Sequence, residues 1–211
     1  MIRAETAQWG FDRCQRFCSK HQPPFLIDDT QAYTIANDQM IITAFRGTTP
    51  TIICDCVYPE IREKIKEFRT NNQTLWFTGH SLGGALAMLA AARMYFEDPK
   101  LLANGVYTFG QPRTCDRLFA KAYDTALKSR AFRFINNNDI VAHAPPELIY
   151  HHAGTLMYFD ANGILHEKWS LWNDLKDKFK GLTADMLAPG TDGVRDHSMD
   201  RYLANIEKNL G

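Results

Sequence analysis

The segment Gly79-His80-Ser81-Leu82-Gly83-Gly84 constrains the fold of this chain more than any other part of the sequence. It matches the pattern G-x-S-x-G, preceded by the apolar run 75–78 of a buried strand and followed by an Ala-, Leu- and Met-rich helix over 85–96. A serine on a sharp strand-to-helix turn has strained backbone angles, so the residues two before and two after it must be small. The sequence therefore predicts that Ser81 is lifted clear of the sheet, with its amide and that of Leu82 facing a developing negative charge.

Length and composition describe an ordinary globular protein. The 211 residues predict a single domain over 1–211, enough to bury roughly 70% of the unfolded surface in one core. Lys+Arg and Asp+Glu number 24 each, so no net field attracts nucleic acid. No apolar run has the length of a transmembrane helix, and residues 1–10 lack the apolar core of a signal peptide. We predict a cytoplasmic location and leave a processed secreted form open.

The five cysteines predict reduced thiols rather than a disulfide framework, because their number is odd. Cys54 and Cys56 are separated by one residue, whereas zinc sites usually place two to four residues between ligands, and no second pair follows. We expect no metal site and no organic cofactor.

Strand and helix patterns alternate along the chain. We predict strands over residues 32–36, 40–45, 75–78, 105–109, 131–135 and 155–159, and helices over 4–19, 59–71, 85–96, 118–127, 171–181 and 199–210. This alternation predicts an α/β fold with a mostly parallel central sheet and helices on both faces. In such sheets the catalytic groups gather at the carboxyl ends of the strands.

A serine hydroxyl needs a neighbouring base before it becomes a good nucleophile, and His197 is the predicted base. It lies in a glycine-rich loop before the last helix, and hydrolases built on this elbow place their triad in the order Ser, acid, His. If Ser198 caps that helix, the helix dipole opposes charging of His197 and keeps its imidazole basic.

The other histidines are weaker candidates. His143 is left open as a residue that lines the site, and His80 is predicted to pack under the turn. His151 and His152 stand at the amino end of strand 155–159, which is the wrong edge of the sheet. We interpret His21 and His166 as surface residues.

Asp139 is the predicted acid, because it follows strand 131–135 directly and lies between the serine and the histidine in the chain. It is expected to accept the ring proton of His197 and to fix the imidazole tautomer. The remaining carboxylates fit structural uses in helices, turns and the histidine loop: Asp116, Asp124, Asp160, Asp192 and Asp196.

An oxyanion hole needs two donors. One is the amide of Leu82, and the other is expected from Thr48, which follows strand 40–45 after Arg46 and Gly47. From these residues alone, Gly47 fits a simple strand-end turn equally well.

Five motifs in this chain resemble those of the class 3 lipase family, the fungal-type lipases and their bacterial relatives. They are Phe45-Arg46-Gly47-Thr48, residues 78–84, Thr108-Phe109-Gly110-Gln111-Pro112-Arg113, Asn138-Asp139-Ile140-Val141 with Pro145-Pro146, and Asp196-His197 with Tyr202. They occur in family order. The resemblance implies an α/β-hydrolase fold, the triad Ser81, Asp139 and His197, oxyanion donors at Thr48 and Leu82, and no cofactor.

The resemblance also implies carboxylic ester substrates, typically acylglycerols at a lipid–water interface. We expect a triacylglycerol lipase that works through an acyl-enzyme on Ser81. A non-lipolytic carboxylesterase or a phospholipase A1 is the alternative, and a catalytically silent scaffold of the same fold is a remote one. Relatives usually carry a lid helix between the oxyanion threonine and the next helix, where this chain has only residues 49–58. Either the lid is deleted or a segment is missing, and the abrupt junction favours the missing segment.

Overall fold

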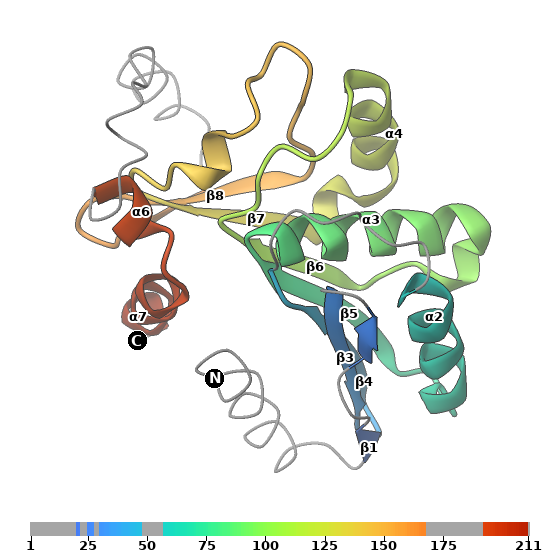
Figure 1. Cartoon of the computed structure of the whole chain (residues 1–211). Helices are drawn as coiled ribbons and strands as arrows, with labels where there is room; N and C mark the ends of the chain where they lie inside the picture. Colours follow the sequence, from blue (N-terminus) through green and yellow to red (C-terminus); the bar gives the residue numbers. More distant parts are fainter. Residues whose placement is uncertain (1–19, 22–24, 28–29, 48–56, 168–191, 211) are drawn as a thin grey trace. The chain divides into compact units, whose positions relative to one another are not determined.

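The computed structural model of the chain describes residues 20–21, 25–27, 30–47, 57–167 and 192–210 (Figure 1). The predicted helices 4–19 and 171–181, Thr48, most of the lid junction and four of the cysteines lie outside the described residues. The chain divides into two compact units, residues 1–106 and residues 107–211. The single domain over 1–211 stays a prediction.

The first unit is built around a sheet whose strands are short at the edge and longer inside. Its elements are β1 (Lys20–His21), β2 (Phe25–Ile27), β3 (Thr30–Ala36), β4 (Met40–Phe45), α2 (Val57–Phe68), β5 (Thr74–His80), α3 (Leu82–Glu97) and η1 (Pro99–Leu101). β6 (Gly105–Phe109) crosses into the second unit. β1 and β2 pair with β3, β3 pairs antiparallel with β4, and β4 pairs parallel with β5.

Local chemistry explains the β3–β4 hairpin and the packing of α2. The side-chain oxygen of Asn37 accepts hydrogen bonds from the amides of Gln39 and Met40 at 2.8 and 2.9 Å, which closes the turn between the two strands. On α2, Ile61 and Ile65 are four residues apart on one face, and both are fully buried.

The parallel pair β4–β5 decides where the first unit can carry a site. Its register sets Phe45 opposite Gly79, so the two strands end at the same edge of the sheet. The chain leaves β4 through Arg46 and Gly47 and leaves β5 through Ser81, and these segments therefore emerge side by side.

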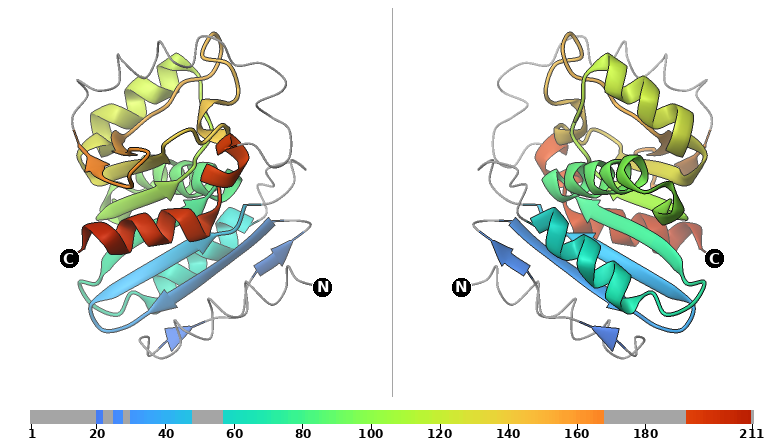
Figure 2. Two further views of the ribbon diagram at one scale, coloured as in Figure 1. Left: turned by 90° about the vertical axis from the view of Figure 1, so that its left-hand side faces the viewer. Right: turned by 90° about the vertical axis from the view of Figure 1, so that its right-hand side faces the viewer.

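The second unit carries α4 (Arg117–Leu127), η2 (Lys128–Arg130), β7 (Ala131–Asn136), η3 (Val141–His143), β8 (Thr155–Phe159), β9 (Leu165–His166), α6 (Asp192–Asp196) and α7 (Met199–Asn209). β7 and β8 run parallel, and β9 returns antiparallel to β8. Figures 1 and 2 show α4 and α7 on opposite faces of β7 and β8, as expected for helices on both faces. Among the described helices, none is long and apolar enough to cross a membrane, and the cytoplasmic location stays a prediction.

An aromatic layer holds α7 against the sheet of the second unit. Phe134, Phe159 and Tyr202 form a buried cluster with Met157. The ring of Phe109 lies 5.1 Å from that of Phe134 and 5.9 Å from that of Tyr202, centroid to centroid. This packing fixes the start of α7, and with it the preceding His197.

His166, expected at the surface, is 30% exposed in its side chain and lies in β9 with its Nε2 3.0 Å from Asp160 Oδ2. Two predictions about this unit need correction. Residues 192–196, expected as loop, form the short helix α6. Ser198 occupies the N-cap position of α7, but its side chain makes no capping bond. Its carbonyl oxygen accepts from the amides of the first turn instead.

Candidate active site

Ser81 sits on a strained turn between β5 and α3. Its φ of 58° and ψ of −130° lie outside the regions that a residue with a side chain normally adopts. Such strain costs of order 1–3 kcal/mol and persists only where the surroundings enforce it. α3 begins at Leu82, three residues earlier than predicted, because the turn at Ser81 leads directly into the helix. The Ser81 side chain makes no capping bond to α3.

Gly79 and Gly83, two residues before and two after Ser81, have neighbouring backbone atoms in the space that a side chain would occupy. A Cβ on Gly83 would overlap the carbonyl oxygen of Phe45 and would lie 2.7 Å from the carbonyl carbon of Arg46. A Cβ on Gly79 would overlap Gly83 and lie 2.7 Å from the amide nitrogen of Gly84. The predicted need for small residues at these positions is confirmed.

The surroundings of Ser81 include the two predicted sources of oxyanion donors. Leu82 is the first residue of α3, where amides have no partner within the helix. Gly47 passes so close that a Cβ built on it would lie 3.1 Å from the Ser81 Cβ. Thr48, one residue further, lies outside the described residues, so its donor role stays a prediction.

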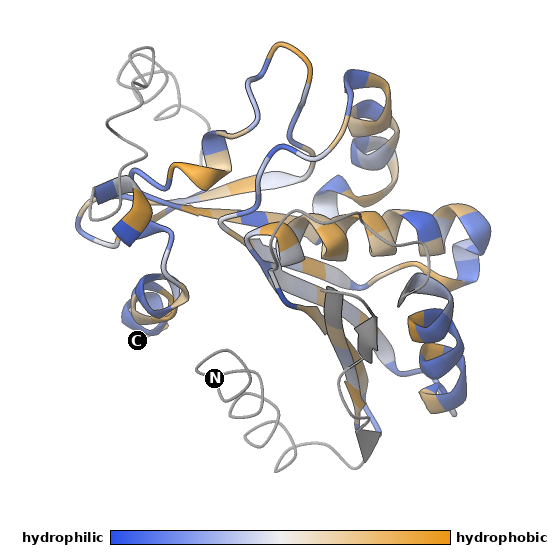
Figure 3. Ribbon diagram, in the orientation of Figure 1, coloured by the Kyte–Doolittle hydropathy of each residue, from blue (hydrophilic) through white to orange (hydrophobic). Residues whose placement is uncertain are grey.

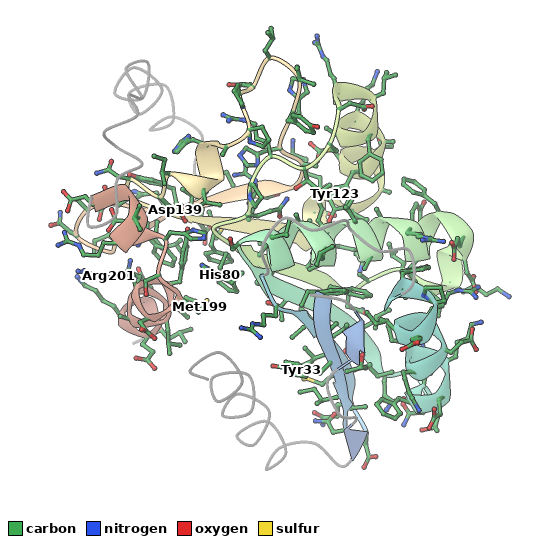
Figure 4. All side chains as sticks on the ribbon, viewed as in Figure 1. Tyr33, His80, Tyr123, Asp139, Met199 and Arg201 are labelled. Atoms are coloured by element: carbon green, nitrogen blue, oxygen red, sulfur yellow. The ribbon has the colours of Figure 1, made fainter. Side chains whose placement is uncertain are left out.

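In the second unit, Asp139 and His197 form the pair that the chain order predicts. Nδ1 of His197 lies 3.0 Å from each carboxylate oxygen of Asp139, which is fully buried. The amides of Val141 and Ala142 donate to Asp139 Oδ1 at 2.9 and 3.4 Å. Figure 4 labels Asp139 in the loop after β7, beside α6. Because a carboxylate accepts only from a protonated ring nitrogen, this contact leaves Nε2 of a neutral His197 as a base.

Tyr202 is a third partner of this pair whose role the sequence did not indicate. Its hydroxyl donates to Asp139 Oδ2 at 2.6 Å and accepts from the amide of Asn136 at 3.0 Å. Burial and the charge of Asp139 raise the pKa of Tyr202 well above its ordinary value, so the hydroxyl keeps its proton and remains a donor.

A buried amide ties the loop that carries His197 to the end of β7. The side-chain nitrogen of Asn136 donates to the carbonyl of Asp196 at 2.9 Å, and its oxygen accepts from Asn205 Nδ2 at 2.9 Å. The carboxylate of Asp196 accepts from Asn137 Nδ2 at 2.8 Å. Asp196 therefore shapes its loop, as predicted. The run of asparagines was the only signal in the sequence that this contact existed.

The other predicted alternatives have structural partners. Asp116 caps α4, and Asp124 accepts from the amide of Gly154. Asp160 closes the β8–β9 turn, and Asp192 pairs with Arg195. His151 and His152 precede β8 at its amino end, as expected. His143 ends η3, and burial together with the nearby Arg113 lowers its pKa to about 4. In the described part of the chain, no group of three His, Cys, Asp or Glu residues could hold a metal ion.

The sequence of this chain is similar to those of known lipases. A sequence model of the family described as "Lipase (class 3)" matches residues 18–149. Triacylglycerol lipase OBL1 of Arabidopsis thaliana is 36% identical over 115 residues, which make up 49% of this chain and 22% of that protein. Phospholipase A1-II 1 of Oryza sativa subsp. indica is 29% identical over 157 residues, or 72% of this chain and 39% of that protein. The chain thus spans less than half the length of either relative.

A solved structure resembles the chain over most of its length. The triacylglyceride lipase of Rhizomucor miehei superposes with a TM-score of 0.61 and covers 84% of this chain and 78% of its own, at 23% sequence identity. This likeness shows that the fold is the predicted α/β-hydrolase fold.

Proposed function

Because the chain belongs to the class 3 lipase family, we propose that it hydrolyses carboxylic esters, with triacylglycerols at a lipid–water interface as its substrates. The strained backbone of Ser81 carries the proposal. A φ of 58° costs a serine free energy, and a serine without a catalytic role has no use for it. In a nucleophile, the same backbone raises the hydroxyl above the sheet, beside the N-terminus of a helix.

In the proposed reaction, His197 Nε2 takes the proton of the Ser81 hydroxyl as Ser81 Oγ attacks the ester carbonyl carbon. The carbonyl oxygen becomes an oxyanion, which the amides of Leu82 and Thr48 stabilise. By analogy with measured cases, each donor is worth roughly 3–4 kcal/mol. The imidazolium then protonates the leaving alcohol, and the acyl group remains on Ser81. Water, deprotonated by the same imidazole, releases the fatty acid.

Asp139 has an electrostatic and an orienting role in this reaction. Its contact with His197 Nδ1 supports the tautomer in which Nε2 is unprotonated. Once Nε2 accepts a proton, the buried carboxylate stabilises the imidazolium. Three further donors, from Tyr202, Val141 and Ala142, hold the carboxylate of Asp139 in its orientation.

Hydrolysis assays on two substrate forms test the proposal. Wild-type protein is expected to hydrolyse p-nitrophenyl butyrate and emulsified trioleoylglycerol, and Ser81→Ala is expected to lose both activities while its circular dichroism is unchanged. Hydrolysis of the soluble ester without the emulsion would favour a non-lipolytic carboxylesterase. Absence of both activities in a folded wild type would favour a silent scaffold.

Phospholipase A1 activity is the second candidate, supported by the rice relative of that name, which aligns with 72% of this chain. Release of the fatty acid from position 1 of phosphatidylcholine, at a rate above that from trioleoylglycerol, would replace the triacylglycerol assignment with this one.

A further inference from the structure

A pocket of about 540 Å³ lies beside α4, in the second unit. Its lining includes Arg117, Lys121 and Asp124 of α4 and the histidines 151 and 152 that precede β8. These histidines stand at the amino end of β8, whereas Asp139 follows the carboxyl end of β7. The pocket lining contains neither Asp139 nor His197, although His152 Nε2 lies 2.8 Å from the carbonyl oxygen of Ala142, whose amide donates to Asp139 Oδ1.

The charges that line the pocket are predominantly positive. Arg117 and Lys121 are four residues apart and share one face of α4. No carboxylate of the described residues pairs with either of them. Asp124 is already engaged, since it accepts from the Gly154 amide at 2.7 Å and lies 3.2 Å from Lys128 Nζ. Two cationic side chains therefore remain available to a ligand.

A buried guanidinium adds to this positive potential. Arg133 of β7 is 5% exposed, and its Nε and Nη1 atoms have no hydrogen-bond partner among the described residues. Burial and the nearby Arg113 lower its pKa only to about 10, so it is charged at neutral pH, and its charge interacts with that of Asp124. Buried donors of a charged group without partners are costly, and a nearby anion reduces that cost.

A backbone bridge joins the segment before α4 to the segment that carries the pocket histidines. Cys115 and His151 form an antiparallel bridge, in which the His151 amide donates to the Cys115 carbonyl at 2.7 Å. Asp116 caps α4 by accepting from the Phe119 amide at 2.8 Å. The residues that present Arg117 and His151 are thus fixed relative to each other before any ligand binds.

Large apolar side chains are exposed next to the pocket along the chain. Leu118 follows Arg117 and is 80% exposed, and Leu148 and Ile149 in the loop before His151 are 91% and 67% exposed. Figure 3 shows the tip of this loop as hydrophobic. Exposed apolar residues beside cationic ones fit a lipid surface, where the acyl region receives the apolar groups and anionic headgroups meet the cations.

We propose that the α4 pocket binds the phosphate headgroup of an anionic lipid, while Leu148 and Ile149 enter the surface beside it. Arg117 and Lys121 contact the phosphate. The buried Arg133 of β7, which does not line the pocket, adds its positive charge without contact. Phosphatidic acid presents such a phosphate as a terminal monoester and is the headgroup that we assign to this site. This site holds the protein on the lipid surface and takes no part in the reaction at Ser81.

Vesicle sedimentation with the full chain tests the site. The Ser81→Ala background prevents hydrolysis, and the vesicles consist of phosphatidylcholine with or without phosphatidic acid. Arg117→Gln/Lys121→Gln is expected to weaken binding to the phosphatidic acid vesicles about 30-fold, since each cation near an anionic surface contributes several-fold. The matched control, Lys100→Gln/Arg201→Gln, removes two exposed cations elsewhere and is expected to weaken binding less than about 3-fold.

Further measurements distinguish phosphate binding in the α4 pocket from a general attraction between cations and the vesicle. With Ser81 intact, Arg117→Gln/Lys121→Gln is expected to hydrolyse p-nitrophenyl butyrate at the wild-type rate, so the site and the reaction can fail independently. Equal losses of binding in the two double variants would overturn the proposal in favour of the general attraction. Equal binding to vesicles without phosphatidic acid would also overturn it. So would calorimetric binding of inorganic phosphate as tight as that of the vesicles, because the lipid would then be unnecessary.

Discussion

Gly110→Ala should damage turnover more than stability, because the new methyl group meets the Asp139–His197 pair. Gly110 has a φ of +58°, and a Cβ built on it would lie 2.7 Å from Asp139 Oδ2 and 2.8 Å from His197 Nδ1. Ordinary contacts begin near 3.4 Å, so the imidazole must move by about 0.6 Å. A displacement of that size in catalytic geometry costs about 10- to 100-fold in kcat.

The stability cost of the same change has two parts. A left-handed backbone costs a residue with a Cβ about 1–2 kcal/mol, and overpacking adds about 1–3 kcal/mol. We therefore expect the free energy of unfolding in urea to fall by about 2–5 kcal/mol. KM for p-nitrophenyl butyrate should change little, since the methyl group acts on the pair and not on substrate binding.

Gly154→Ala is the matched control. Gly154 has a φ of +83°, and a Cβ on it would lie 3.0 Å from the carbonyl oxygen of Ala131, far along the chain from Asp139 and His197. It should lose a similar free energy of unfolding and keep the wild-type kcat. Equal kcat values in the two variants, measured where both are folded, would refute the assignment of the pair as catalytic.

The second unit supports three other predictions. Tyr202→Phe removes the 2.6 Å bond to Asp139 and leaves the Asn136 amide without its acceptor, so urea unfolding should show a loss of about 2–4 kcal/mol; an unchanged midpoint would contradict this bond. Asp139→Asn should cost about 10⁴-fold in kcat with the fold retained by circular dichroism, because the amide supports the wrong tautomer of His197; a loss below tenfold would reassign the acid. Burial lowers the pKa of His143 from 6.5 to about 4. As the pH falls below 6.5, the imidazole of His143 therefore binds a proton in the unfolded chain but not in the folded one. The free energy of unfolding of the wild type falls by about 3 kcal/mol by pH 4 as a result. His143→Gln should show a correspondingly shallower decline in urea titrations at successive pH values, and an identical decline would show that His143 is not the group involved.

The elements around Ser81 could be predicted from sequence because local rules determine them. β4, β6 and β8 begin and end as expected, since each is an apolar run bounded by turn residues. Asp139 and His197 could be paired because chain order and strand ends limit the choices.

The contacts that support this pair could not be predicted, because they join residues far apart in the chain without a local pattern. Tyr202 reaches Asp139 across 63 positions, and Asn136 reaches Asp196 across 60. α6 and β9 were missed for a related reason, since segments of five and two residues are too short to show a period. Their positions depend on packing against the rest of the second unit.

Covalent labelling of Ser81 tests the proposed nucleophile most directly. A fluorophosphonate probe should attach once per molecule, and peptide mapping should find it on the peptide that contains Ser81. His197→Ala should label at least 100-fold more slowly, because the hydroxyl then lacks its base. Attachment to another serine, or labelling of Ser81 at the same rate in His197→Ala, would contradict a serine hydrolase in which His197 activates Ser81.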